Sequence, residues 1–355
     1  MKKTVTTALK IAVSLALYVY IFSKIHIGDL WSILKTADAS YLLAAVAVYA
    51  LIQALSAYRW YLLLRPVDLN AGYSKLLSFY FLGMFFNFLL PTAIGGDVFR
   101  VYFLHKETGK LSPSTASVFV DRDLGMAALL LVATVVAAVA GTRFNGVPLA
   151  PMFGLVVIAF VAANLAIFYR PTYNLLHKML ALFRLKKADE KVDRLYQSVN
   201  SYRGEWGLMS TAIVLSVAVQ IGCVVVNVLA AASIGVRTDN GWVDYLVFIP
   251  AIGLISMVPL SLNGMGWREV SYLVLFHSVG VSEQGAAALA FLWLGVLVAT
   301  SLPGGIILIL RGRRGERTLP PRDEILAGDD AGQGRAEQLL DLAGQASGEE
   351  SVPSI

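Results

Sequence analysis

Long runs of apolar residues recur along almost the whole chain, and they constrain its fold more than any other feature. A helix needs about 20 apolar residues to cross the hydrocarbon core of a bilayer, and fewer where long flanking side chains reach the interface. The runs that meet this requirement cover residues 8–23, 41–63, 73–90, 113–140, 149–169, 207–234, 242–259 and 285–310. The sequence therefore predicts an all-α polytopic membrane protein with about eight transmembrane helices.

The composition agrees with a bilayer as the main solvent of this chain. Of the 355 residues, 57% are hydrophobic and 15% are charged. Soluble domains contain roughly 45–50% apolar and about 25% charged residues. The net charge of +5 would suit a nucleic-acid partner, but the basic residues lie in loops between apolar runs. That placement is typical of membrane topology, so we expect a lipid environment and no nucleic-acid partner.

Lysine and arginine residues gather in certain loops and so predict the orientation of the chain. Cation-rich loops stay in the cytoplasm. Residues 170–203 hold eight such cations, and Lys2, Lys3 and segment 311–317 add more. Loops 24–40, 141–148 and 235–241 carry few charges or balanced ones, as expected on the opposite side. We therefore expect a multi-pass protein of the cell inner membrane with both termini cytoplasmic.

Strict alternation of eight spans conflicts with this orientation, because it places residues 170–203 outside. Two breaks rich in Pro and Gly resolve the conflict. Residues 91–97 read Pro-Thr-Ala-Ile-Gly-Gly-Asp and precede a short apolar piece, and residues 259–269 repeat the device. A chain that turns at these breaks within the membrane returns to the side from which it entered. The sequence thus predicts two re-entrant broken helices, one entering from each side.

The two broken segments also resemble each other in sequence. Asp97 precedes His105 by eight residues, and Glu269 precedes His277 by the same interval. Opposite orientations combined with likeness are typical of inverted repeats, whose substrate site lies near the membrane midplane. The alternative is two ordinary Pro/Gly kinks that resemble each other by chance.

Charged residues inside the predicted membrane segments are the strongest candidates for a functional site. Such residues are expensive in a bilayer, and they must meet one another, a water-filled cavity or a ligand. Asp121, Arg122 and Asp123 lie about ten residues into their run, roughly 15 Å deep. The candidate substrate-binding residues are Gly95, Gly96, Asp97, Arg100, Asp121, Arg122, Asp123, Gly264, Gly266, Arg268 and Glu269.

Two interpretations of these residues remain open. In the first, arginines bind a lipid phosphate bidentately, while the glycine-rich breaks leave helix N-terminal amides free to face the ligand. In the second, the charges form a purely structural ion-pair network that pins the broken helices to run 113–140. Arg59 and Trp60 are interpreted as interfacial anchors. The chain has one cysteine, Cys223, and no metal-binding or nucleophile motif, so we expect no metal, cofactor or catalytic residue.

Three ordered motifs carry a resemblance to a known family. They are Asn87-x-x-Leu90-Pro91-x-x-x-Gly95-Gly96-Asp97-x-x-Arg100, then Asp121-Arg122, then Pro259 with Gly264-x-Gly266-x-x-Glu269. The chain resembles the lysylphosphatidylglycerol synthase transmembrane (flippase-like) family over roughly residues 5–312. The usual first acid of the second motif is Glu, so Asp121 is a conservative departure. The resemblance implies a stand-alone member, without the soluble aminoacyl transferase domain, that moves or presents lipids in a bacterial or archaeal inner membrane.

The sequence therefore predicts an integral membrane flippase-like domain over residues 1–312 and a disordered cytoplasmic tail over 313–355, because the tail is polar and acidic. We expect a non-enzymatic flippase or transporter for an anionic phospholipid or polyprenyl-linked lipid. One alternative is a membrane-embedded enzyme, or an enzyme accessory, that acts on a lipid-linked substrate. Another is a scaffold that recruits a soluble lipid-modifying synthase. The sequence leaves the lipid, the transport direction, the driving ion and the oligomeric state open.

Overall fold

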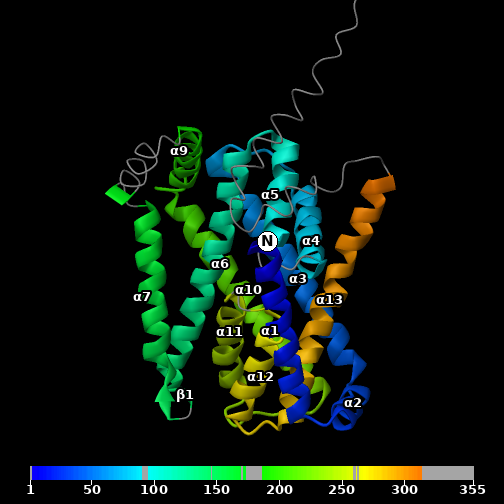
Figure 1. The fold of residues 1–355 in the computed structure, drawn as a ribbon. Coiled ribbons are helices and arrows are strands. Elements are labelled where there is room, and N and C mark those ends of the chain that lie inside the picture. Colours follow the sequence, from blue (N-terminus) through cyan, green and yellow to red (C-terminus); the bar gives the residue numbers. More distant parts are fainter. Residues whose placement is uncertain are drawn as a thin grey trace, which may run out of the picture.

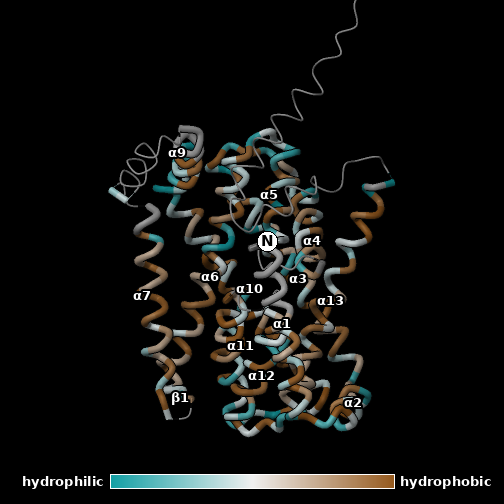
Figure 2. The backbone as a smooth tube through the Cα atoms, in the orientation of Figure 1, coloured by the Kyte–Doolittle hydropathy of each residue, from teal (hydrophilic) through white to brown (hydrophobic). Residues whose placement is uncertain are grey.

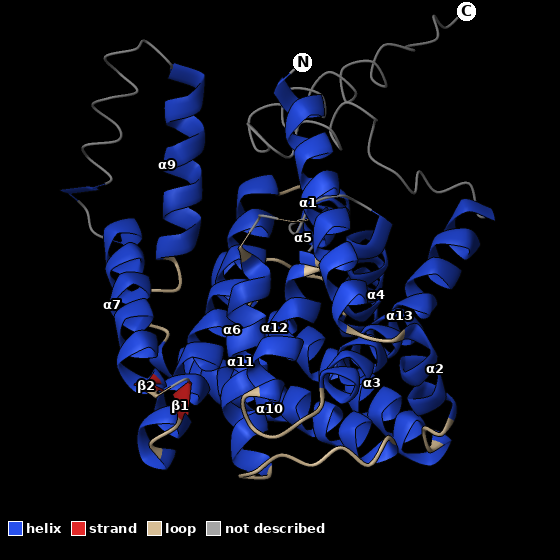
Figure 3. Cartoon of the chain, turned by 60° about the horizontal axis from the view of Figure 1, so that its bottom comes forward, coloured by secondary structure: helices blue, strands red, loops and turns tan. Residues whose placement is uncertain are grey.

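The computed structural model describes residues 2–89, 95–144, 146–168, 171–172, 186–258, 261 and 264–313. Helices dominate these ranges (Figure 3), and a ribbon of β1 (Arg143–Phe144) and β2 (Val147–Pro148) is the extended structure within them. The helices are α1 (Lys2–Lys24), α2 (Ile27–Lys35), α3 (Ala39–Leu62), α4 (Tyr73–Leu89), α5 (Gly95–Thr108), α6 (Leu111–Ala140), α7 (Leu149–Phe168), α9 (Lys186–Asn200), α10 (Trp206–Ser233), α11 (Trp242–Met257), α12 (Trp267–His277) and α13 (Glu283–Arg313), with a 3₁₀ turn η1 (Arg65–Val67) after α3. Apart from Arg313, which ends α13, the predicted tail lies outside the described residues.

Each predicted apolar run falls on its own helix. The runs correspond to α1, α3, α4, α6, α7, α10, α11 and α13. Hydrophobic residues follow the lengths of these helices, while hydrophilic residues gather toward the two ends of the bundle (Figure 2). This confirms a polytopic α-helical membrane protein. In the described ranges, four helices are long and apolar enough to cross a membrane by themselves, namely α3, α6, α10 and α13. The count of about eight spans therefore stays a prediction.

Two helical hairpins enter the bundle from opposite ends. In Figure 1, α4 and α5 occupy the upper half, whereas α11 and α12 occupy the lower half. The first turn, at residues 90–94, lies outside the described residues. Asp97 is the third residue of α5 and Glu269 is the third residue of α12. This arrangement agrees with the predicted pair of opposed broken helices.

The first hairpin is held by aromatic pairs and by one close backbone approach. Phe86 stacks on Phe99 with ring centroids 3.6 Å apart, and Phe79 stacks on Phe103 at 5.5 Å. Between these pairs, a Cβ added at Gly96 would overlap the carbonyl oxygen of Gly83. Glycine is therefore required here so that α4 and α5 can touch.

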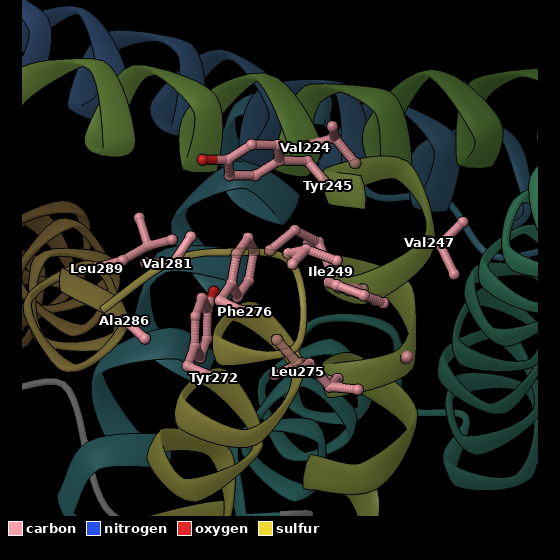
Figure 4. Packing of buried hydrophobic residues seen from close by; sticks show 14 of the residues in the cluster. Val224, Tyr245, Val247, Ile249, Tyr272, Leu275, Phe276, Val281, Ala286 and Leu289 are labelled. Atoms are coloured by element: carbon pink, nitrogen blue, oxygen red, sulfur yellow. The ribbon is translucent and has the colours of Figure 1, made fainter. Parts of the chain in front are cut away.

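The second hairpin is held by a separate apolar cluster (Figure 4). Tyr272 and Phe276 of α12 stack at 5.6 Å, and Phe248 of α11 meets the Phe276 ring edge-on. The Tyr272 hydroxyl donates a hydrogen bond to Asn227 Oδ1 of α10 at 2.6 Å. Polar residues expected inside the membrane thus serve here as links between helices, as is common in membrane bundles.

Helix α2 lies within segment 24–40, which the sequence predicts to be a loop between two spans. It bends 85° away from α1. Leu30 is buried against the bundle while Ile27 and Trp31 are exposed, and the Lys35 ammonium lies 5.3 Å from the Trp31 ring centroid. Nine residues are too few for an apolar run to reveal them, so only an amphipathic pattern could have found this helix.

The opposed hairpins predict which loops share a side of the membrane. We expect a cysteine at Lys106, at the end of α5, to be labelled by an impermeant maleimide only from the cytoplasmic side. A matched cysteine at Arg237, in the loop at the other end of the bundle, should be labelled only from outside. Both residues are exposed. A Cys223→Ala background removes the native thiol, which packs in the apolar cluster around α10 and α11. Labelling of both cysteines from the same side of intact cells would contradict the re-entrant arrangement.

Candidate functional site

A buried carboxylate, Asp121 of α6, joins three helices. Its Oδ1 accepts a hydrogen bond from Nε of Arg59 in α3 at 2.8 Å and lies 2.8 Å from Nη2 of the same guanidinium, and its Oδ2 accepts a hydrogen bond from Nη2 of Arg100 in α5 at 2.7 Å. The side chain of Asp121 is 1% exposed. Arg59 also donates from Nη1 to Ser216 Oγ of α10 at 2.6 Å. Asp121 is therefore the centre of a charged network that ties α3, α5, α6 and α10 together.

Arg100 is fully enclosed by this network. Its guanidinium carbon lies 4.2 Å from the Trp60 ring centroid and 4.3 Å from that of Tyr80. Its Nη1 contacts Asp97 Oδ1 at 3.3 Å. With two aromatic rings packed against it and two carboxylates as partners, Arg100 can release those partners only at a large cost, since buried ion pairs that lose one partner are strongly destabilised.

Arg122 is the accessible cation of the network. It pairs with Asp97 Oδ2, and its side chain is 38% exposed, against 7% for Arg100 and 15% for Asp97. The five contacting residues hold three guanidinium groups (Arg59, Arg100, Arg122) and two carboxylates (Asp97, Asp121). The network thus carries one surplus positive charge, and Arg122 is the member best placed to present that charge.

Asp123 points away from the network. Asn164 of α7 donates from Nδ2 to Asp123 Oδ1 at 3.1 Å. Successive residues of an α-helix point about 100° apart, so Asp121, Arg122 and Asp123 face three different neighbours. Asp123 therefore does not join the cluster that Asp97, Arg100, Asp121 and Arg122 form.

Arg268 and Glu269 form a second, separate pair at the start of α12. Glu269 Oε1 accepts from Nε and Nη2 of Arg268, at 3.1 and 2.7 Å, and Glu269 Oε2 accepts from the Gly266 amide at 2.6 Å. Within the described residues no ion pair joins this pair to the Asp121 network, so the expected meeting of the charged groups is only partly found.

Gly264 and Gly266 both have positive φ, at 73° and 81°. A Cβ at Gly266 would also overlap α1, lying 2.8 Å from Leu17 Cβ. These glycines shape the break between α11 and α12 and let α1 pack against it.

The glycine amides do not match the predicted bare N–H groups. The Gly96 amide donates to Asn87 Oδ1 at 2.8 Å, and the Gly266 amide donates to Glu269. Both amides have intramolecular acceptors, so the prediction of helix N-terminal amides free to face a ligand is wrong for Gly96 and Gly266. The sequence offered one indication of this, because the polar residue Asn87 lies one helix turn before the first break and can accept a hydrogen bond from an amide there.

Arg59 and Trp60 are also placed differently from the prediction. They are 4% and 0% exposed, so they are core residues and not interfacial anchors. The signal was present in the sequence, because Arg59 lies inside run 41–63 and not beyond its end. A charge inside an apolar run is the condition that marked the other candidates.

Opposed half-length hairpins and a buried charge network define a class of polytopic membrane proteins in which broken helices converge on a central polar region. The chain belongs to the family described as the lysylphosphatidylglycerol synthase TM region, whose model matches residues 7–304. A UPF0104 membrane protein of Methanothermobacter thermautotrophicus is 27% identical over 280 residues, covering 74% of this chain and 82% of the relative. A UPF0104 membrane protein of Pyrococcus horikoshii is 23% identical over 306 residues, covering 79% and 90%.

Proposed function

We propose that this protein is a non-enzymatic flippase that moves, or presents for movement, a lipid with an anionic head group across the cell inner membrane. In this proposal both termini are cytoplasmic and the substrate is an anionic phospholipid or a polyprenyl-linked lipid phosphate. The observation that carries the proposal is the surplus positive charge of the buried network, presented by the partly exposed Arg122.

Arg122 suits a phosphate group by its chemistry. A guanidinium group offers a planar fork of donors that matches two phosphate oxygens and is less strongly hydrated than an ammonium group. Its partner Asp97 also contacts Arg100. When a phosphate takes Arg122, Asp97 keeps a cationic partner and is not left as an unpaired charge. The ion pair of Asp97 and Arg122 is therefore the exchangeable part of the network.

The remaining candidate residues hold the site in this proposal. Arg59, Arg100 and Asp121 fix α5 against α3 and α6, while Gly96 allows α4 and α5 to touch and Gly95 begins α5. Gly264, Gly266, Arg268 and Glu269 shape the start of the second hairpin from the opposite side. Opposed broken helices around a central polar site are the arrangement expected for alternating access.

The test is translocation by the purified full-length chain in proteoliposomes. A fluorescent short-chain phosphatidylglycerol in the inner leaflet should become extractable by external albumin faster than in protein-free vesicles. The zwitterionic phosphatidylcholine analogue should move more slowly, because it does not neutralise the surplus charge. Heat-denatured protein provides the control for leakage. Equal rates with and without folded protein would sink the proposal, and equal acceleration of both lipids would remove the role of head-group charge.

A further inference from the structure

Asp123 is a carboxyl group in the middle of a membrane helix that the phosphate site does not use. It lies twelve residues after Leu111 in the 30-residue helix α6, roughly 18 Å along the axis at 1.5 Å per residue. Its Oδ1 accepts a hydrogen bond from the side-chain amide of Asn164 at 3.1 Å. Among the described residues no Lys, Arg or His side chain forms an ion pair with it.

The described side chains of the helices packed around α6 provide no ion-pair partner for Asp123 either. Residues Leu149–Phe168 of α7 and Trp206–Ser233 of α10 contain no charged side chain, and Cys223 is the ionisable group of α10. On α11, Asp244 lies in the first turn and accepts a hydrogen bond from Asn240 Nδ2. Other described charged residues on neighbouring helices have partners of their own or are exposed. Arg59 of α3 and the residues Asp97 and Arg100 of α5 belong to the charged network. On α9, Asp193 bonds to Gln197 and Arg194 is exposed.

An ionised carboxylate held in a bilayer without a cation is costly, and the usual remedy is to bind a proton. The Asn164 amide can bond to the carboxyl oxygen in either state. Proton uptake at Asp123 then needs no rearrangement of α6 and α7. A hydronium ion transfers its proton to a carboxylate oxygen and leaves water, and no other bond changes.

The net charge of the network together with Asp123 depends on whether Asp123 carries a proton. The network and its neighbour Asp123 together hold three cations (Arg59, Arg100, Arg122) and three carboxyl groups (Asp97, Asp121, Asp123), although Asp123 bonds to Asn164 and to none of the cations. With Asp123 ionised the sum is zero, and with Asp123 protonated the sum is +1. Asp123 directly follows Arg122 in the chain, so its charge acts on the residue that presents the surplus.

We propose that Asp123 is a proton-binding site coupled to the anionic head-group site at Arg122, so that a proton and the lipid bind together. The inference rests on the proposed function and adds its driving ion. Coupling between two sites is reciprocal. Low pH therefore tightens lipid binding, and lipid binding takes up a proton. A proton gradient across the membrane then biases the direction in which the lipid moves.

The first experiment measures binding and does not depend on transport. Short-chain phosphatidylglycerol is added to the purified chain in a weakly buffered solution with a pH-indicator dye. The wild type should take up a fraction of a proton that is largest near the midpoint of Asp123 titration, about half a proton per molecule for tenfold coupling. Asp123→Asn keeps the carbonyl oxygen that accepts from Asn164 and should take up none. Equal uptake by the wild type and Asp123→Asn would overturn the site.

The second experiment measures translocation between about pH 5.5 and 8, the range over which a membrane carboxyl group can titrate. The wild-type rate should rise about tenfold toward low pH, within the usual range of coupling between sites. Asp123→Asn should be pH-independent and Asp123→Glu should keep the dependence. Asp29→Asn, at the exposed end of α2, is the matched control and should follow the wild type.

The outcomes separate the two proposals. Translocation that is independent of pH in the wild type would overturn the coupling while the flippase proposal stands. No translocation at any pH would overturn the proposed function, and the proton-uptake measurement would still decide whether Asp123 is a coupled proton site.

Discussion

Asp121→Asn is expected to cause the largest loss of stability of any single isosteric change in this protein. The substitution removes the negative charge shared by Arg59 and Arg100, and it leaves both guanidinium groups buried with an uncharged neighbour. Breaking a buried ion pair from one side costs about 3–5 kcal/mol. We expect the unfolding midpoint of the detergent-solubilised chain to fall by several degrees, with reduced recovery of monodisperse protein.

Asp123→Asn is the matched control, because it makes the same chemical change two residues further along α6. Asp123 has an amide partner in place of arginine partners, so its unfolding midpoint should stay close to that of the wild type. Adding Arg59→Gln to Asp121→Asn removes one uncompensated cation and should recover part of the loss. Equal stability of the two single variants would show that the Asp121 network does not hold the helices together.

The fold was predictable to a large extent because a bilayer leaves few choices. Backbone groups in hydrocarbon must be satisfied within helices, so each apolar run had to become a helix, and each did so within a few residues. The opposed hairpins followed from the same rule, since the cations of loop 170–203 and the Pro/Gly breaks left one consistent path. Helix α2 was not predicted because its nine residues, which follow α1 after an 85° bend, are too few to stand out as an apolar run.

The site was less predictable because partner choice depends on which way each side chain points. The sequence indicated that buried charges must meet, and Asp97, Arg100, Asp121 and Arg122 do meet. It could not show that Arg59 joins them from α3, or that Asp123 turns toward α7. These outcomes depend on helix rotation and packing, which a linear pattern with nearly uniform hydrophobicity does not encode.

Within the proposed function, the geometry favours a different arginine for the lipid phosphate than the sequence alone suggests. From sequence, Arg100 and Arg268 were as good candidates as Arg122. Arg100 packs against Trp60 and Tyr80 and is held by two carboxylates, and Arg268 is held by Glu269. A residue that holds helices in place is a poor choice for a group that must bind and release a substrate. Arg122 is therefore the best candidate for phosphate binding, because its partner Asp97 also contacts a second cation, Arg100.

Arg122→Gln is accordingly expected to reduce translocation of the phosphatidylglycerol analogue by at least about tenfold, the loss that follows from removing one charge-assisted contact worth about 1.5–3 kcal/mol. Stability should change little, because Arg122 is 38% exposed and Asp97 retains Arg100. Arg122→Lys should be intermediate, since lysine keeps the charge and loses the planar fork.

Arg100→Lys should show the reverse pattern, with lower stability and near-normal transport per folded molecule. Arg143→Gln, in the exposed β1 strand at the other end of the bundle, is the control for a general loss of positive charge. The rates are measured in proteoliposomes and normalised to monodisperse protein. Wild-type transport by Arg122→Gln would remove Arg122 from the site, and a transport defect of Arg100→Lys without a loss of stability would assign the phosphate to Arg100.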